Sequence, residues 1–373
     1  MKWVALLLAL AAAFALAVVA AAAPPPVDAQ AYLVQNSGTG EVLAAEDERE
    51  RLPMASITKL MTALVAVEHA SLDDVATISR RTASIGESTI NLRPGERVTL
   101  RDLIRAALIQ SANDAANAIA AFVGRGSVAH FVELMNARAR ELGLADTHFA
   151  NPDGLDARGH FSSARDVTKL ARVVMNKPFI RATVRLVTAT AAGRRLHNRN
   201  DLLSSYPSTI GVKTGHTDGA GWSQVAAARG GGVTMYATIL GGETREERNG
   251  DLAGLLAWGL SRYRTVWAID GDRVYGTART GYGRDPVRLV ASKPALRVIH
   301  VERPLLERVV RPVEVALPVL EGQRLGEVQV VDRGRVIARS PLVAASAVEK
   351  PGAVGRVGFY AGRTLDHLGG LFS

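Results

Sequence analysis

The sequence contains no cysteine, which excludes disulfide bridges and thiol chemistry. Aromatic residues make up only 5% of the 373 residues, and acidic residues are fewer than basic ones, 36 against 45. A chain of this length can form two domains without covalent cross-links. The formal charge of +9 favours anionic partners, such as phospholipid headgroups, acidic polymers or nucleic acid.

The chain begins with the layout of a secretory signal. Lys2 supplies the positive charge, an uninterrupted apolar run covers 4–19, and small residues follow. We expect cleavage after Ala29 rather than after Ala23, because Pro24 is a poor residue behind a cleavage site. An uncleaved anchor is the alternative, since the run approaches the length of a membrane span. Both readings predict an extracytoplasmic protein, and with the lack of aromatic-interleaved basic motifs they argue against nucleic acid.

Ser56 and Lys59 form the first candidate for chemistry. The residues that follow, 60–68, are apolar at helical spacing, so both side chains should share one face of a helix's first turn. A helix N-terminus favours negative charge on a nearby serine oxygen. The lysine acts as a base near neutral pH only if burial or a neighbouring cation lowers its pKa. Alone, the pair is a weak signal that a surface helix with a serine cap explains equally well.

Strand and helix patterns alternate in the first two thirds of the chain. Strands are expected at 31–35 and 41–44, joined by a hairpin turn, and an antiparallel meander at 209–240. Thr99, Ser127 and Ser163 are expected to cap helices, and 246–262 reads as a further helix. The region between Ser71 and Arg97 is irregular and indicates a long ordered loop. These patterns predict an α+β domain over 30–264, after a signal peptide over 1–29.

A composition change near residue 265 predicts a second domain. Short valine-rich runs follow at regular spacing, with many arginines, which indicates a small all-β domain over 265–351. The expected strands are 287–290, 296–299, 313–316, 327–331 and 335–337. His300 stands alone there, so we interpret it as a packed or surface histidine.

The last segment, 352–373, has the pattern of a basic amphipathic helix. Its apolar positions at helical spacing are Val354, Val357, Ala361, Leu365, Leu368 and Phe372. Such a helix can lie in a membrane interface, and the aromatic residues of the segment favour that position. Gly369 and Gly370 weaken this reading, and a helix docked on the β domain is the alternative. We expect membrane contact.

Two further motifs follow the Ser56 pair in a fixed order. Ser111-x-Asn113 interrupts a helical pattern with small polar residues, which alone indicates a cap or turn. Lys213-Thr214-Gly215 lies on the first strand of the predicted meander. Motifs of this kind, in this order, are those of penicillin-binding proteins and class A β-lactamases. Their joint occurrence, each in its proper structural context, favours one site over separate coincidences.

The chain resembles the D-alanyl-D-alanine carboxypeptidases of the low-molecular-mass penicillin-binding protein class, the serine peptidases related to penicillin-binding protein 5. The likeness is carried by 55–62, 110–115, 149–155, 160–166, 198–200 and 211–218. It covers the signal and the catalytic domain and, more loosely, the β domain and the tail. The resemblance implies a five-stranded antiparallel sheet flanked by helices, as in β-lactamases and transpeptidases. We expect neither a metal nor another cofactor.

The resemblance also implies a mechanism in peptidoglycan biosynthesis. Ser56 attacks the carbonyl between the last two D-alanines of a stem peptide, and Lys59 as free amine takes its proton. D-alanine leaves, and water hydrolyses the acyl-enzyme. Ser111 relays the proton to the leaving amine, while Asn113 holds the peptide and orients Lys59. β-Lactam antibiotics are expected to act as covalent inhibitors.

Substrate binding is assigned by the same resemblance. Lys213 attracts the terminal carboxylate and helps to keep Lys59 deprotonated, and Thr214 donates a hydrogen bond to that carboxylate. The main-chain N–H groups of Ser56 and His216 form the oxyanion hole. Glu87 borders the cleft. The expected substrate-binding set is Lys213, Thr214, Gly215, His216, Arg199 and Arg248, in which the two arginines contact substrate or support a loop.

Several alternatives use related chemistry. A class A β-lactamase adds a glutamate that positions the deacylating water, and 146–156 contains none, so penicillin should inhibit the protein. An endopeptidase of the same family uses the same site but often lacks the β domain. Glutaminases and esterases with Ser-x-x-Lys lack the other two motifs. A non-catalytic penicillin-binding receptor is disfavoured because every proposed catalytic residue is present.

Overall fold

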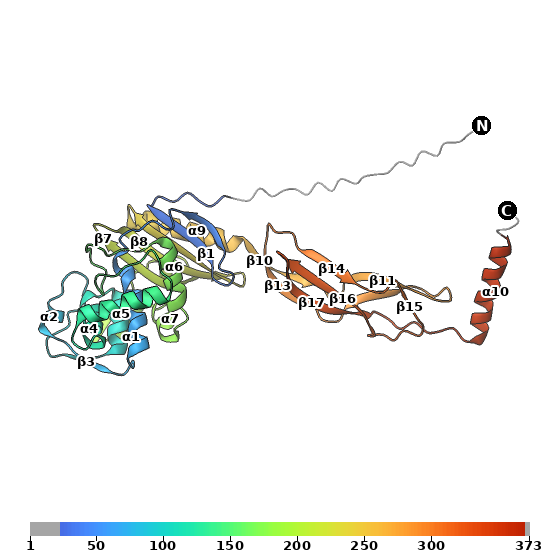
Figure 1. The fold of residues 1–373 in the computed structure, drawn as a ribbon, viewed down its shortest axis with the longest axis horizontal. Helices are drawn as coiled ribbons and strands as arrows, with labels where there is room; N and C mark the ends of the chain where they lie inside the picture. Colours follow the sequence, from blue (N-terminus) through green and yellow to red (C-terminus); the bar gives the residue numbers. More distant parts are fainter. Residues whose placement is uncertain (1–22, 370–373) are drawn as a thin grey trace, which may run out of the picture.

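The computed structural model of the chain describes residues 23–369, which form an elongated molecule (Figure 1). A mixed α+β part occupies one end, a β-rich part follows along the long axis, and helix α10 lies at the other end. The core of the predicted signal, 1–22, lies outside the described residues. Val27 and Ala29 pack against a buried cluster of the α+β part, so cleavage after Ala29 would remove these contacts.

The α+β part is built on a five-stranded sheet in the order β2-β1-β9-β8-β7. All four pairings are antiparallel, as the sequence predicts. The predicted hairpin and meander are confirmed as β1 (Ala31–Asn36), β2 (Val42–Glu46), β7 (Thr209–Thr217), β8 (Gly221–Gly230) and β9 (Val233–Gly242).

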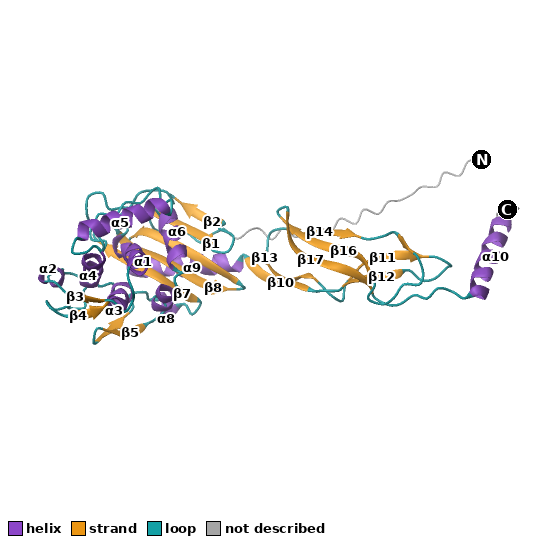
Figure 2. Ribbon diagram, turned by 60° about the horizontal axis from the view of Figure 1, so that its bottom comes forward, coloured by secondary structure: helices purple, strands orange, loops and turns teal. Residues whose placement is uncertain are grey.

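Both faces of this sheet are covered by helices (Figure 2). Side chains alternate across a strand, so along β8 Val225 and Ala227 join the larger core, whereas Ala226 and Ala228 join the smaller one. The smaller core is closed by α9 (Arg245–Ser261), near the predicted 246–262. The larger core is closed by α1 (Lys59–His69), α4 (Asn113–Val123), α5 (Val128–Glu141) and α6 (Ala164–Val174).

The three predicted helix caps are confirmed. The side-chain oxygens of Thr99, Ser127 and Ser163 each accept a hydrogen bond from the main-chain N–H three residues later. Shorter elements complete this part: β3 (Val75–Thr77), α2 (Arg80–Ala83), β4 (Arg97–Thr99), α3 (Leu100–Arg105), α7 (Pro178–Thr183), β5 (Thr188–Ala191), β6 (Arg194–His197) and α8 (Leu202–Ser205).

The β-rich part contains a two-stranded and a six-stranded sheet. The predicted runs correspond to β12 (Val287–Ala291), β13 (Ala295–His300), β15 (Glu314–Val315), β16 (Arg324–Asp332) and β17 (Arg335–Ala344). Three strands outside those runs complete the sheets: β10 (Tyr263–Ile269), β11 (Val274–Thr280) and β14 (Leu306–Val310). The composition change at residue 265 therefore falls inside β10.

Helix α10 (Ala353–Gly369) extends from the end of the β-rich part. Its Val354 and Val357 are 87% and 70% exposed, whereas Phe359 and Tyr360 make edge-to-face contacts with Tyr282. Within 23–369, no single helix is both long and apolar enough to cross a membrane. Among those same residues, one bent pair, α4 and α5, reaches that length and hydropathy together, with an angle of 89° between the two helices.

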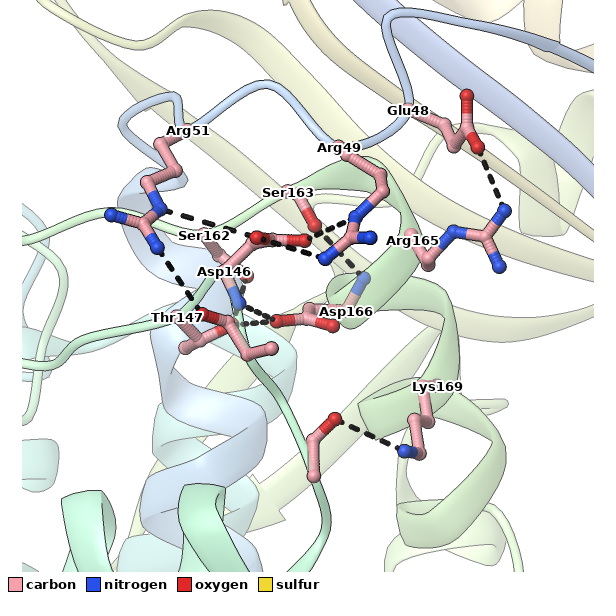
Figure 3. A network of polar contacts seen from close by, with 12 residues as sticks. Glu48, Arg49, Arg51, Asp146, Thr147, Ser162, Ser163, Arg165, Asp166 and Lys169 are labelled. Carbon is pink, nitrogen blue, oxygen red and sulfur yellow. Dashed lines mark hydrogen bonds and ion pairs between the residues drawn. The ribbon is translucent and has the colours of Figure 1, made fainter.

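A polar network fixes the segment that runs from α5 to α6 (Figure 3). Arg49 Nε donates to the Asp146 carboxylate at 3.0 Å. Asp166 of α6 accepts from the Asp146 N–H at 2.7 Å and from Thr147 Oγ1 at 2.8 Å. Burial raises the pKa of Asp166. The network anchors the loop whose following residues, 150–156, approach Lys59.

Replacing Asp166 should destabilise the protein. In Asp166→Ala the buried Asp146 N–H loses its acceptor, which should lower the free energy of unfolding by about 2 kcal/mol. Asp166→Asn keeps an acceptor oxygen of the same shape and should cost less. Chemical denaturation of both variants measures the difference, and wild-type stability of Asp166→Ala would contradict the anchoring role.

Candidate active site

Ser56 lies in a short 3₁₀ turn, Ala55–Thr58, and Lys59 is the first residue of α1. The sequence predicts both residues in the first turn of one α-helix. The structure instead has a separate 3₁₀ turn, which is tighter than an α-helical turn, directly before α1. The two side chains still meet, since Lys59 Nζ donates to Ser56 Oγ at 2.7 Å. A hydroxyl nucleophile and an amine base are therefore in direct contact.

Lys59 is fully buried, and all three of its Nζ protons have acceptors. Besides the serine hydroxyl, these are Asn113 Oδ1 at 2.7 Å and the main-chain carbonyl of Asp153 at 2.6 Å. Burial lowers the pKa of Lys59 to about 8. The carboxylates of Asp153, Glu87 and Asp114 oppose that shift. The amine is thus held in place and titrates far below an ordinary lysine.

The second motif bridges the two lysines of the site. After α3, a π-helical segment, Ala106–Gln110, leads to Ser111, whose left-handed backbone (φ 65°, ψ 30°) turns the chain into α4. Ser111 Oγ accepts from Lys213 Nζ at 2.9 Å, while Asn113 at the start of α4 contacts Lys59. The Asn113 N–H donates to the carbonyl of Ser88 at 2.6 Å, which holds the preceding long loop against the site.

Lys213 is buried on β7, and its Nζ also donates to the Thr214 carbonyl at 2.9 Å. Burial lowers the pKa of Lys213 well below its ordinary value, and repulsion from Lys59, Arg199 and Arg248 adds to the effect. Burial is therefore the leading cause of both shifts. The repulsion between the two lysines acts on both amines and favours the neutral form of one of them, and the expected effect of Lys213 on Lys59 stays a prediction.

Two glycines lie against the backbone of the nucleophile turn. A Cβ on Gly215 would lie 2.7 Å from the Met54 carbonyl oxygen and 3.2 Å from Ser56 N. A Cβ on Gly154, which has φ +91°, would lie 2.0 Å from the Ala55 carbonyl oxygen. Only glycine permits such approach. The end of β7 and the 150–156 loop therefore hold the turn from two sides.

A cavity of about 260 Å³ opens beside Ser56. It is lined by Ser56, Ser88, Ser111, Arg199, Thr214, Gly215, His216, Trp222, Arg245 and Arg248. The two predicted arginines and His216 thus lie at the cavity, with Lys59, Asn113 and Lys213 buried behind its wall. Arg199 and Arg248 give the cavity a positive charge that suits a carboxylate ligand, whereas Arg245 is ion-paired with Asp201 at 2.6 Å.

Arg248 is the most buried of these arginines, at 1% exposed, and burial lowers its pKa to about 10. Its Nε makes no hydrogen bond within the described part of the chain. Arg199 is exposed and is fixed through its main-chain N–H, which donates to the Ile109 carbonyl at 3.2 Å. The two arginines therefore differ, with one a buried cation and the other a rim residue.

Trp222, Arg245 and Ser88 are cavity residues that the sequence motifs do not predict. Trp222 is paired with His216 across β7 and β8, and their ring centroids are 4.0 Å apart. Pairing the two strands of the predicted hairpin in register would have placed Trp222 opposite His216. Arg245 lies three residues before Arg248 on α9, a spacing that places both on one helical face.

A serine beside a low-pKa lysine, a second hydroxyl bound to another lysine and a cationic cavity are the components of acyl transfer through a serine ester. Among residues 23–369, no group of His, Asp or Glu is arranged to hold a metal ion. A family model described as D-alanyl-D-alanine carboxypeptidase matches residues 18–244. The chain belongs to this family.

Relatives from two bacteria match almost the whole chain. The D-alanyl-D-alanine carboxypeptidase DacD of Salmonella typhimurium is 33% identical over 356 residues, which covers 90% of each protein. DacC of Escherichia coli is 34% identical over 350 residues, covering 89% of this chain and 87% of that protein. These similarities confirm the predicted family and its serine carboxypeptidase activity.

Solved structures confirm the predicted fold class. Penicillin-binding protein 6B of Escherichia coli is 30% identical, with a TM-score of 0.65 over 88% of this chain and 98% of that one. Penicillin-binding protein 5 of Haemophilus influenzae is 27% identical, with the same TM-score, over 88% and 99%. A Streptomyces DD-transpeptidase is 32% identical, with a TM-score of 0.61, and covers 64% of this chain and 99% of its own.

The pKa of about 8 for Lys59 predicts a pH-dependent acylation rate. A lysine accepts a proton only as the free amine, so acylation by a labelled penicillin should slow about tenfold per pH unit below pH 8 and level off above it. Glu87→Gln removes a carboxylate that raises this pKa, and should move the rise to lower pH. Glu50→Gln, an exposed carboxylate that does not act on Lys59, should leave the profile unchanged. A rate independent of pH between about 6 and 8 would contradict the assignment.

Proposed function

We propose that the protein removes the terminal D-alanine from peptidoglycan stem peptides through an acyl-enzyme on Ser56. The 2.7 Å contact between Ser56 Oγ and the low-pKa amine of Lys59 carries this proposal. Ser56 Oγ attacks the carbonyl carbon of the penultimate D-alanine as its proton passes to Lys59. The C–N bond then breaks, the ester forms, and water later hydrolyses it.

The leaving D-alanine amine needs a proton, and the second motif supplies a route. Ser111 Oγ is bound to Lys213 Nζ at 2.9 Å and lines the cavity into which the substrate would enter. The proton that Lys59 took from Ser56 is relayed through the Ser111 hydroxyl to the nitrogen as the C–N bond breaks. D-alanine therefore leaves as a neutral amine. Asn113 keeps Lys59 aimed at Ser56, because its Oδ1 accepts from Lys59 Nζ at 2.7 Å while its Nδ2 donates to the Gly86 carbonyl at 3.3 Å.

Substrate binding also decides which lysine carries a proton. The terminal carboxylate of the stem is an anion, and beside Lys213 it would raise the pKa of that lysine. Lys213 then becomes the cation that pairs with the substrate, together with Thr214 and the arginines of the cavity. Its charge, close to Lys59, favours the free amine that acylation requires. The two lysines thus act as a coupled pair.

The oxyanion of the tetrahedral intermediate is assigned to the main-chain N–H groups of Ser56 and His216. The close packing of Gly215 against the 54–56 backbone supports this assignment, because it brings the end of β7 beside the nucleophile. One such donor is typically worth about 3 kcal/mol of barrier. The ring of His216 instead stacks on Trp222, which leaves it a structural role.

β-Lactams should acylate the same serine and leave slowly. The loop 146–156 contains no glutamate. It therefore lacks the residue with which a class A β-lactamase positions the deacylating water. An endopeptidase of the same family is the second candidate. The match of both parts of this chain to proteins named carboxypeptidases supports the first.

We also propose an extracytoplasmic location at the membrane surface. Val354 and Val357 leave apolar surface exposed on α10, which suits insertion into a lipid interface. The β-rich part then serves as a spacer between that surface and the catalytic cavity (Figure 1). In this division the chain has a signal at 1–29, a catalytic domain at 30–264, a β domain at 265–351 and an anchor at 352–373.

Ser56→Ala should abolish release of D-alanine from a peptide ending in D-Ala-D-Ala, by about 10⁴-fold or more. Labelled penicillin should no longer attach to the protein. Ser205→Ala changes an exposed serine away from the cavity and should keep both activities. Retained D-alanine release by Ser56→Ala would disprove the mechanism, whereas penicillin attachment to the wild type without D-alanine release would indicate a receptor.

Deleting residues from Val354 onward should move the protein from the membrane to the soluble fraction, because it removes the amphipathic helix. The comparison uses chains whose N-terminal signal has been replaced by a cleavable one, and centrifugation of cell membranes measures it. D-alanine release should be unchanged, since the residues that line the cavity belong to the α+β part, which lies at the opposite end of the molecule from α10. Unchanged sedimentation with membranes would contradict the anchor.

A further inference from the structure

A second cavity, here called the basic pocket, lies apart from Ser56, between α6, α7 and the strand ends near the turn from β8 to β9. It has a volume of about 770 Å³. Its charged and aromatic lining consists of Lys169, Arg172, Arg181, Arg185, Arg229 and Tyr236, and none of its lining residues is acidic. The pocket therefore carries five positive charges without a lining carboxylate.

No carboxylate of the described chain lies within ion-pair distance of these five side chains, although the Asp166 carboxyl, three residues before Lys169 on α6, senses the charge of that lysine. None of them forms an ion pair, although their neighbours do: Arg165 on α6 pairs with Glu48, and Lys177 pairs with Glu68. Like charges repel when they are brought together without counter-ions. A cluster of this kind is electrostatically incomplete on its own.

Neutral groups hold three of the cations in place. Arg172 donates to Gln35 Oε1 at 3.0 Å and to the Ser37 carbonyl at 2.9 Å. Arg181 donates to the Met175 carbonyl at 3.0 Å, and Lys169 donates to the Gly143 carbonyl at 3.1 Å, visible in Figure 3. These bonds orient the side chains without neutralising them.

The exposed Arg185 and Arg229 donate no side-chain hydrogen bond within residues 23–369. They remain available to a ligand.

Tyr236 is a second, independent sign of a ligand. Its side chain is 3% exposed and lines the pocket, yet its hydroxyl makes no hydrogen bond to another described residue. The oxygen itself is not fully enclosed by protein, so it faces the open space of the pocket and can bond to a ligand there. Burial raises the pKa of Tyr236 to about 12, so the hydroxyl is a proton donor at neutral pH. It lies close enough to Arg172 and Arg181 to sense their charge.

We propose that the basic pocket binds a ligand with several phosphate groups. Arginine side chains and a tyrosine hydroxyl match the oxygens of phosphate, and guanidinium groups bind them in pairs. Five cations over about 770 Å³ call for several anionic groups rather than one orthophosphate. The pocket belongs to the α+β part, whereas α10 lies at the far end of the molecule (Figure 1). A soluble polyphosphate or a phosphate-bearing wall polymer therefore suits the pocket better than the headgroups of a membrane that α10 touches.

Sodium tripolyphosphate, titrated into the purified full chain by calorimetry, tests the proposal. We expect saturable binding with one site. Arg185→Ala combined with Arg229→Ala should weaken it about tenfold or more, because two charged hydrogen-bond donors are lost. Tyr236→Phe should weaken it about fivefold, and thermal unfolding checks that this buried substitution leaves the fold intact.

The matched control removes the same charge elsewhere. Arg140 and Arg195 are exposed, form no ion pair and lie outside the pocket, so replacing both by alanine should leave tripolyphosphate affinity within about twofold. Equal losses in the two double variants, or no saturable binding to the wild type, would overturn the proposal. Both double variants should release D-alanine at the wild-type rate, because neither touches the active-site cavity.

A vesicle arm separates the two sources of phosphate. Each double variant, lacking residues from Val354 onward, is sedimented with vesicles that contain about one third anionic phospholipid. Weaker sedimentation of the Arg185 and Arg229 variant than of the control would identify headgroups as the phosphate source. Equal sedimentation, with tripolyphosphate binding retained by the control alone, would assign a soluble or polymeric phosphate.

Discussion

A buried ammonium group surrounded by three oxygen atoms is the interaction on which the catalytic part depends. Lys59 Nζ reaches the hydroxyl of the nucleophile, an amide oxygen at the start of α4 and a main-chain carbonyl of the 150–156 loop. Asn113 and Asp153 lie 54 and 94 residues after Lys59 in the sequence. A buried charge without partners would be very costly. The fold must therefore bring all three segments together before the site exists.

Electrostatics gives the two buried lysines different surroundings. Carboxylates lie near Lys59 and arginines near Lys213, so the same burial produces unequal effects on the two amines. Burial disfavours the charged form of Lys213, and in the proposed mechanism an anionic substrate reverses that preference. In that mechanism, the substrate carboxylate that binds to Lys213 also favours the free amine of Lys59, so substrate binding and activation of the base are coupled.

The sequence predicts the polar residues of the site better than the contacts that place them. Ser56, Lys59, Ser111, Asn113 and Lys213 carry short motifs, and the structure brings all five together. The carbonyl of Asp153 has no such signal, because a main-chain oxygen is the same in every residue.

Periodicity likewise predicts the hairpin, the meander and the capped helices, since these depend on near neighbours in the chain. It does not predict the π-helical segment before Ser111 or the strand β14. The π-helical segment is set by packing between distant segments. β14 is a mostly exposed edge strand, and its apolar and polar residues do not alternate along the chain.

The contacts of Gly154 and Gly215 give the cavity one rigid wall and one adaptable wall. On the side of the nucleophile, backbone touches backbone, and no side chain can be added without displacing the 54–56 turn. Elsewhere in the lining, Arg199 and Arg245 are long side chains, of which Arg245 is bonded to the Asp201 carboxylate. A change in the size or shape of acceptable peptides would therefore have to come from the arginine wall. The restriction applies to natural variants and to engineered ones, because a side chain at Gly154 or Gly215 would collide with the 54–56 backbone.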